Sequence, residues 1–285
     1  MSLDTLLKTY GGIGLGGEGV LRTAGRSDEA REVIHEALEQ GIGYFDSARV
    51  YADSELYYGS VWRERSEARA RIFQTSKSAS RRRDEALADL ESTLKRLETD
   101  YLDLWQIHDV RDRDDLDVIS GPGGALEAFV EARESGKVRF IGVTGHQDPA
   151  ILTEAVESWP VDAVLLPVNP VEAVLGGFLT ATLPAARAKN IAVIAMKILG
   201  GSHYLNPALP VSAEDLVRFA LAFDVTMAIV GCSSREEVKI LGGVKNDGAV
   251  PADAEKVARM EKIYEPYARK LAFYRGRETL GDGPR

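Results

Sequence analysis

The chain has 285 residues, of which 45% are hydrophobic and 28% charged, and its formal net charge is −9. Its only dense basic run, Arg81–Arg83, is too short to follow a phosphate backbone, and its single cysteine, Cys232, excludes an intramolecular disulfide, a cysteine zinc cage and an iron–sulfur cluster. No apolar run has transmembrane length and the N-terminus lacks the features of a signal peptide, so we expect a cytoplasmic protein with no nucleic-acid or membrane partner.

Eight short apolar runs are spaced along the chain and predict strands. Each is nearly continuous in apolar residues, which is typical of parallel strands that are buried on both faces. In chain order the predicted strands are Thr9–Leu15, Ile42–Ser47, Ile72–Ser76, Leu102–Ile107, Val138–Val143, Ala163–Val168, Ile191–Met196 and Met227–Val230.

Helical patterns separate these strands, as where Ala30, Val33, Ile34 and Ala37 recur at helical spacing. Right-handed crossovers between parallel strands favour a closed (β/α)8 TIM barrel, and the length fits a single domain over residues 1–285. A doubly wound open sheet is the alternative. It is disfavoured because no Gly-x-Gly-x-x-Gly follows the first strand in a strand–turn–helix setting.

The C-terminal part of the chain predicts one element beyond the barrel. Pro251 to about Tyr274 has the apolar spacing of one additional C-terminal helix, and Gly281–Arg285 predicts a loose tail.

Four titratable side chains are expected to meet at the carboxyl ends of three neighbouring strands. Asp46 ends the second strand, Lys77 follows the third and His108 follows the fourth, while the loop 47–50 returns Tyr51 to the same mouth. Catalytic groups gather at this face of such barrels. Each residue alone has an ordinary structural explanation, but together a carboxylate, an ammonium, an imidazole and a phenol can deliver a proton to a developing oxyanion.

These residues resemble the aldo-keto reductase family, from roughly Gly14 to Leu241. The run G43-Y-F-D-S-A-R-V-Y-A-D-S-E55, followed by Gly59, is similar to the family's second-strand signature. The lysine after the third strand, the histidine after the fourth and the run G136-K-V-R-F-I-G-V-T144 follow in the family's order. The resemblance implies an NAD(P)H-dependent oxidoreductase that reduces a small-molecule aldehyde or ketone by hydride transfer.

In that chemistry Tyr51 is expected to donate the proton. A phenol with a pKa near 10 is a poor acid at neutral pH, so the Lys77 ammonium is expected to lower the pKa of Tyr51. Asp46 is expected to keep Lys77 charged and fixed, and His108 to polarise the substrate carbonyl.

The resemblance also implies a nicotinamide dinucleotide across the barrel mouth, for which we expect NADP(H), with NAD(H) as the alternative. The sequence departs from the family pattern where Thr144-Gly145 replaces a Ser-Asn pair, Leu165 a glutamine and Met196 an aromatic residue. Glu237 also stands near a position that is usually basic. The expected cofactor contacts are Gly16, Thr144, His146, Asn169, Met196, Leu199, Gly201, Gly231, Ser233, Ser234 and Arg235.

No pair of histidines has metal-ligand spacing, so no metal is expected. Two other functions stay open. One is a noncatalytic nicotinamide-nucleotide-binding subunit, as occurs within this family. The other is a Schiff-base lyase or aldolase that uses Lys77 or Lys197. The sequence leaves the substrate and the oligomeric state undetermined.

Overall fold

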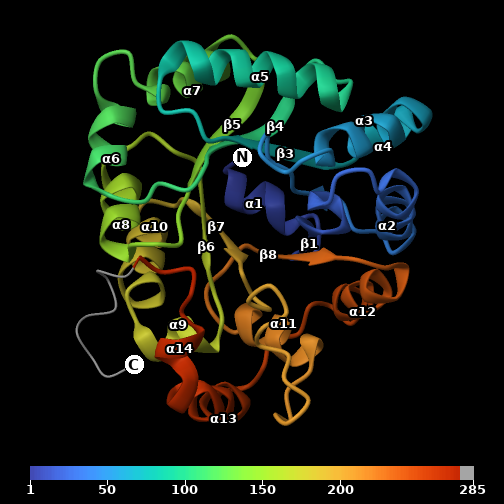
Figure 1. The fold of residues 1–285 in the computed structure, drawn as a ribbon, viewed down its shortest axis with the longest axis vertical. Coiled ribbons are helices and arrows are strands. Elements are labelled where there is room, and N and C mark those ends of the chain that lie inside the picture. Colours follow the sequence, from blue (N-terminus) through green and yellow to red (C-terminus); the bar gives the residue numbers. More distant parts are fainter. Residues whose placement is uncertain (277–285) are drawn as a thin grey trace.

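The computed structural model describes residues 1–276, and its centre is a closed barrel of eight parallel strands (Figure 1). The strands pair in chain order, and β8 closes the barrel against β1. This confirms the predicted (β/α)8 architecture. The strands are β1 (Ile13–Gly19), β2 (Tyr44–Phe45), β3 (Phe73–Ser78), β4 (Leu102–Ile107), β5 (Val138–Thr144), β6 (Ala163–Pro167), β7 (Ala192–Met196) and β8 (Met227–Cys232).

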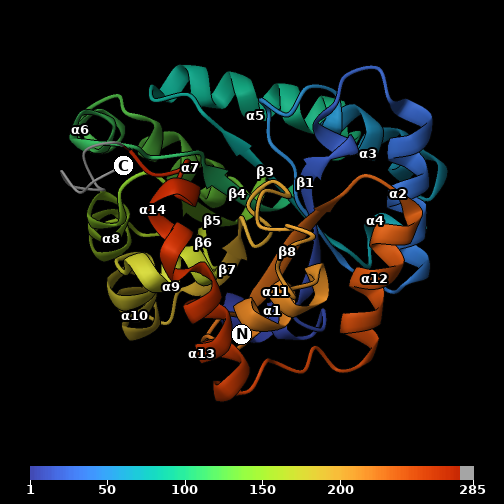
Figure 2. The ribbon, with the colours of Figure 1, turned by 60° about the horizontal axis from the view of Figure 1, so that its bottom comes forward.

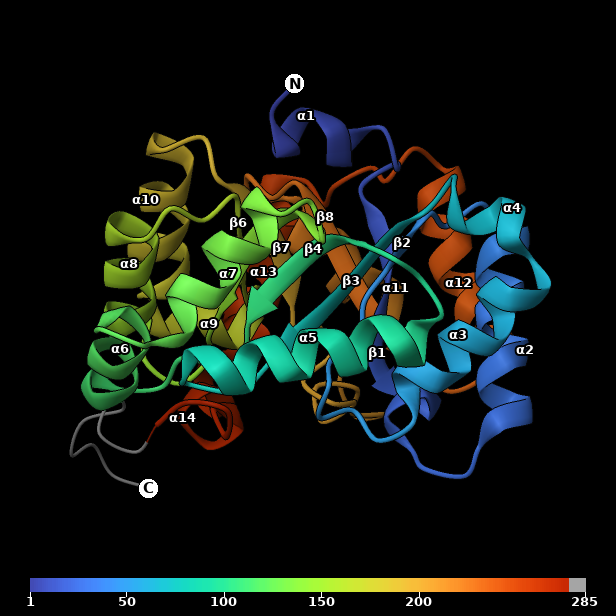
Figure 3. The ribbon, with the colours of Figure 1, turned by 90° about the horizontal axis from the view of Figure 1, so that it is seen from above.

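Helices surround the barrel and cover its outer face (Figure 3). The α-helices are α1 (Leu3–Lys8), α2 (Ser27–Glu39), α3 (Ser54–Glu64), α4 (Ser66–Arg69), α5 (Arg83–Leu97), α6 (Arg113–Ser120), α7 (Ala125–Glu134), α8 (Pro149–Ser158), α9 (Pro170–Leu175), α10 (Leu183–Ala188), α11 (Ala213–Leu221), α12 (Arg235–Asn246), α13 (Ala254–Tyr264) and α14 (Ala268–Leu271). Short turns of 3-10 helix, η1 (Val20–Arg22) and η3 (Glu265–Tyr267), and one π-helix, η2 (Phe178–Thr182), complete the described chain.

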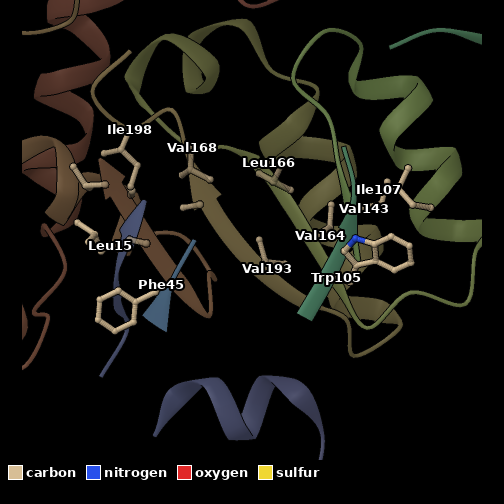
Figure 4. Packing of buried hydrophobic residues seen from close by; sticks show 14 of the residues in the cluster. Leu15, Phe45, Trp105, Ile107, Val143, Val164, Leu166, Val168, Val193 and Ile198 are labelled. Atoms are coloured by element: carbon tan, nitrogen blue, oxygen red, sulfur yellow. The ribbon is translucent and has the colours of Figure 1, made fainter. Parts of the chain in front are cut away.

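Apolar side chains fill the barrel on both sides of its sheet. Inside, Tyr44, Phe73 and Ile194 pack with other strand residues, and α1 adds Leu3 and Leu7 to this cluster at the amino ends of the strands. Outside, a second cluster fills the space between strands and helices, where Figure 4 shows residues such as Leu15, Phe45 and Trp105. The interior of the barrel is therefore a packed core, and active sites of such barrels lie at the carboxyl-end mouth.

The first strand begins four residues later than predicted. Thr9 is the C-cap residue of α1. Gly11 and Gly12 then take φ values of 79° and 73°, which are left-handed conformations incompatible with a strand. The strand pattern therefore starts at Ile13. Helix α1 itself was not predicted, because six residues give too short a periodic pattern to recognise.

The predicted C-terminal helix is present but interrupted. The segment forms α13, the 3-10 turn η3 and then α14, with Pro266 inside the turn. Proline lacks the N–H that a continuous helix would need there, which accounts for the break. The predicted tail at Gly281–Arg285 lies outside the described residues.

Candidate active site

The backbone at three of the four expected site residues is held by the barrel's own hydrogen bonds. Asp46 directly follows β2, and its N–H donates to the carbonyl of Leu15 at 2.9 Å. Lys77 lies within β3, and His108 directly follows β4, where its N–H donates to the carbonyl of Ser78 at 2.9 Å. These bonds extend the ladder past the strands, so the barrel fixes the positions of all three residues.

Tyr51 reaches the same place from the loop between β2 and α3. Two tight turns fold this loop, since the N–H of Tyr51 donates to the carbonyl of Ala48 at 2.9 Å and its own carbonyl accepts from the N–H of Ser54 at 2.8 Å. Gly17 leaves room for the ring, because a Cβ at that position would lie 2.7 Å from it. The tyrosine is only 7% exposed.

Lys77 and Asp46 form a buried ion pair at the centre of the site. Nζ of Lys77 donates to Oδ2 of Asp46 at 2.6 Å and to the carbonyl of Ser47 at 2.9 Å, while Oγ1 of Thr75 donates to Oδ1 of Asp46 at 2.8 Å. Burial lowers the pKa of Lys77, and the Asp46 carboxylate acts in the opposite direction. Both oxygens of Asp46 are therefore committed to fixed donors, and the ammonium is held in one position.

The ring of Tyr51 packs against this pair and against His108. Nζ of Lys77 lies 4.9 Å from the ring centroid, and the His108 ring meets it edge-on, with centroids 5.6 Å apart. Burial, followed by the charge of Asp46, raises the pKa of Tyr51 well above its usual range. This net direction is opposite to the low pKa expected for Tyr51, and the contribution of the Lys77 ammonium itself stays a prediction.

His108 is held in its neutral form. Burial and then the nearby Lys77 charge lower the pKa of His108 well below its usual value. Its Nδ1 is buried and has no hydrogen-bond partner among residues 1–276. A neutral imidazole at this place can donate one hydrogen bond from a ring N–H but carries no charge to compete with Lys77.

A cavity of about 350 Å³ lies beside Tyr51 and extends across the strand ends to α12. Asp46 and Tyr51 line it, together with six of the eleven expected cofactor contacts, namely Gly16, Met196, Leu199, Gly201, Gly231 and Ser233. The segment between β7 and α11 also contributes lining residues and passes over this end of the barrel (Figure 2). The residues that line the cavity therefore include the proton-donor candidate and residues of α12.

Two further expected contacts, Thr144 and His146, are engaged beside the cavity. Oγ1 of Thr144 accepts from the N–H of Asp109 at 2.8 Å. Nδ1 of His146 lies 3.2 Å from the carbonyl of Tyr274, and its Nε2 is 3.1 Å from Oδ1 of Asp109 without the alignment of a hydrogen bond. These side chains connect the β4 and β5 loops to the C-terminal segment, and neither lines the cavity.

Two others are helix caps. Oδ1 of Asn169 accepts from the N–H of Glu172 at 2.9 Å at the start of α9, and Oγ of Ser234 accepts from the N–H of Glu237 at 3.3 Å at the start of α12. Their oxygens satisfy helix donors that would otherwise lack partners. A ligand that contacts Asn169 or Ser234 would have to share the capping oxygen with a helix N–H, or contact other atoms of the side chain.

The turn that precedes α12 is already occupied by protein charges. The N–H of Ser233 donates to Oε2 of Glu237 at 2.6 Å, so one of the donors expected for a phosphate has a carboxylate partner. The guanidinium of Arg235 pairs with Glu36 of α2 at 2.8 Å, and Arg235 does not line the cavity. A phosphate at this turn would have to displace Glu237 and draw Arg235 away from Glu36.

Two prominent cavity residues, Glu18 and Tyr274, were not foreseen from the sequence. Oε1 of Glu18 pairs with Nζ of Lys197 at 2.8 Å, and that Nζ lies 4.6 Å from the ring centroid of Tyr274. Glu18 was recognisable as the one acidic residue within Gly11–Gly19, at the end of a strand. Tyr274 had no such signal, because its position depends on how the C-terminal segment returns to the barrel.

Comparisons with known proteins agree with this architecture. A family model described as the aldo/keto reductase family matches residues 9–207. Solved structures with similar folds include the holo form of aldo-keto reductase AKR11C1 from Bacillus halodurans, with a TM-score of 0.70, 20% identity and coverage of 88% of this chain and 91% of that one. An aldo/keto reductase from Brucella melitensis has a TM-score of 0.67, 24% identity and coverage of 88% and 92%.

Curated relatives show the same likeness in sequence. Human aldo-keto reductase family 1 member C2 is 30% identical over 68% of this chain and 66% of its own length, and glyoxal reductase from Bacillus subtilis is 32% identical over 60% and 59%. The match to 6-dehydroglucose reductase of Novosphingobium aromaticivorans, at 28% identity, spans 41% of each protein. Matches to two further relatives cover 50% and 53% of the relatives' own length. Because the family model covers more than half of the sequence, this chain belongs to the aldo/keto reductase family.

Proposed function

We propose that this chain reduces an aldehyde or ketone, with Tyr51 as the proton donor and NADP(H) as the coenzyme. The observation that carries this proposal is the convergence of Tyr51 on the buried Lys77–Asp46 pair and on His108, beside a cavity that Tyr51 and Asp46 line. When bound, the coenzyme would supply a hydride to the carbonyl carbon. The protein's part is to hold the carbonyl oxygen and give it a proton.

The raised pKa of Tyr51 suits a donor of this kind. A phenol that stays protonated across the neutral range always has its proton available, and it gives that proton up only to a stronger base. An alkoxide that forms as hydride arrives is such a base. Neutral His108 can donate to the same oxygen, and the Lys77 ammonium beside the ring stabilises the phenolate that remains.

The lining of the cavity supports a dinucleotide as its ligand. Its lining residues include Tyr51 and, on α12, Ile240 and Leu241, and six of the eleven expected coenzyme contacts are among them. Met196 offers a soft apolar surface for the nicotinamide end. The likeness to Bombyx mori aldo-keto reductase, solved in complex with NADP, supports the coenzyme class at 21% identity. NAD(H) is the alternative coenzyme, and Glu237 at the α12 turn is the observation that favours it.

The same contacts argue against an imine mechanism. A Schiff-base lysine needs a free, neutral amine, whereas Lys77 is 1% exposed and donates to Asp46 and Ser47. Lys197, the other candidate, pairs with Glu18. Neither amine is free to attack a carbonyl in this arrangement.

The test is the variant Tyr51→Phe. It should lower kcat by on the order of a hundredfold or more with little change in NADPH affinity, because only the transferable proton is lost. Tyr267→Phe, which alters a half-exposed tyrosine on η3, is the matched control. NADPH oxidation with a panel of aldehydes and ketones would measure turnover, and fluorescence titration would measure affinity. Turnover by Tyr51→Phe at the level of the control would refute the role of Tyr51.

A further inference from the structure

A glutamine lies inside the apolar barrel, one step deeper than His108. Side chains alternate between the two faces of a strand, and on β4 Leu104 belongs to the interior cluster while Trp105 belongs to the outer one. The same alternation places Gln106, and then His108, on the interior face. Gln106 is fully buried, and a Cβ at Gly142, its register partner on β5, would lie 3.1 Å from the Cγ of Gln106. Gly142 therefore leaves room for this side chain.

The amide of Gln106 is buried without a protein partner. Neither its Oε1 nor its Nε2 makes a hydrogen bond within the described part of the chain. Gln74 is buried to the same degree, but its Oε1 accepts from Nε1 of Trp62 at 2.9 Å and its Nε2 donates to the carbonyl of Thr75 at 2.9 Å. An unpaired buried amide costs stability, and an apolar side chain of the same shape would avoid that cost. Packing alone therefore does not account for a glutamine at position 106.

His108 lacks a complementary partner two residues further along the same face. Of its two ring nitrogens, Nδ1 is the one that is buried and unpaired among residues 1–276. A neutral imidazole carries its proton on one nitrogen and accepts a hydrogen bond at the other, and the bond at one nitrogen decides which of them is protonated. If His108 is to donate to a substrate oxygen from Nε2, its Nδ1 has to accept a hydrogen bond.

The spacing of these groups suits a bridge of one water molecule. Residues two apart on a strand have Cα atoms roughly 6.6 Å from each other. A buried water typically makes about three hydrogen bonds to groups that would otherwise be unpaired. Nδ1 of His108 and the two polar atoms of the Gln106 amide are three such groups. A water-mediated bond is almost as favourable in enthalpy as a direct one.

We propose that Gln106 is a positioning residue, which binds one internal water against Nδ1 of His108 and so keeps the ring proton on Nε2. From Nε2 the proton can be donated to the substrate oxygen. Gln106 does not line the cavity, so it acts only through His108. The inference rests on the proposed carbonyl reduction at Tyr51, but the protonation of the ring can be measured without turnover.

The variant Gln106→Leu removes the amide and keeps a side chain of similar size. Nitrogen-15 NMR of the histidine rings at about pH 7.5 would show which ring nitrogen is protonated. The chain has four histidines, and the signals of His108 are those that disappear in His108→Gln. We expect the proton on Nε2 in the wild type and a mixture of both tautomers in Gln106→Leu. A proton on Nδ1 in the wild type, or unchanged His108 signals in Gln106→Leu, would overturn the inference.

Turnover and stability separate positioning from a purely structural role. Gln106→Leu should lower kcat roughly three- to tenfold, the effect of one hydrogen bond between neutral groups, with little change in NADPH affinity or in the free energy of unfolding. Tyr58→Phe is the control, because it removes another buried, unpaired polar group of the described chain, on α3 outside the barrel. This control should keep wild-type kcat and wild-type His108 signals.

Two further outcomes distinguish this inference from the proposed function. If Gln106→Leu loses stability and turnover together while the His108 signals stay unchanged, the glutamine is structural and the inference is overturned. If the wild-type enzyme reduces no compound of the carbonyl panel, the proposed function is refuted. A shift of the His108 tautomer in Gln106→Leu would then still support the internal hydrogen bond.

Discussion

Replacing Lys77 by methionine tests how much the chain depends on its buried ion pair. Lys77 and Asp46 have side-chain exposures of 1% and 3%, so the methionine variant leaves an unpaired carboxylate in the barrel with Thr75 as its remaining side-chain donor. Removing one partner of a buried pair typically costs 3–5 kcal/mol, and we expect a loss of roughly that size in the free energy of unfolding. Lower pH should reduce the loss, because proton uptake removes the unpaired charge.

Urea unfolding followed by circular dichroism would measure this loss. Lys8→Met is the control, since it breaks an exposed Lys8–Asp4 pair, with 60% of the lysine side chain accessible, and should cost less than about 1 kcal/mol. The double variant Asp46→Leu/Lys77→Met should recover much of the stability but no activity, because apolar replacements of buried pairs are often neutral or better. A loss for Lys77→Met no larger than that of Lys8→Met would refute the reasoning.

Three further predictions follow from other contacts. The folded-state pKa of His108 lies below its unfolded value of about 6.5, so the unfolded chain binds more protons at low pH and the free energy of unfolding should fall as pH falls. His108→Gln should make the free energy of unfolding less dependent on pH, which urea unfolding at about pH 5 and about pH 7.5 would measure. Glu237→Gln should strengthen the binding of NADPH relative to that of NADH, because it removes the carboxylate that accepts from the N–H of Ser233. Fluorescence titration would measure both affinities. Arg275→Met should release the C-terminal segment by leaving Glu172 unpaired, and limited proteolysis should then cleave this segment faster than in the wild type.

Much of the barrel could be predicted because buried parallel strands have a simple sequence pattern. The predicted strand Leu102–Ile107 has the bounds of β4, and the strands from Val138 onward differ from the structure by only a residue or two at their ends. The first strand was misplaced because Thr9 and Tyr10 are good strand formers, whereas the glycines that follow them form a turn. Local preference was overridden there by the cap of α1, which no periodicity revealed.

The residues of the candidate site were easier to predict than their partners. Asp46, Lys77 and His108 are visible in the sequence because each follows or ends an apolar run, and the barrel then brings all such ends together. Pairing is different, because it depends on residues far away along the chain. Arg235 was expected to face a phosphate, but it pairs with Glu36, almost two hundred positions earlier, which no spacing rule connects to it.

The electrostatics of the site also correct the simplest view of its chemistry. A lysine beside a tyrosine suggests a phenol of low pKa, yet burial, followed by the charge of Asp46, raises the pKa of Tyr51 well above its usual range. The phenol is therefore a weak acid before substrate reacts. In the proposed reaction, Tyr51 would give up its proton to the strongly basic oxygen that forms as hydride arrives, so we expect proton transfer to be coupled to hydride transfer. In the same proposal, the Lys77–Asp46 pair would fix the geometry and the Lys77 ammonium would stabilise the phenolate that remains.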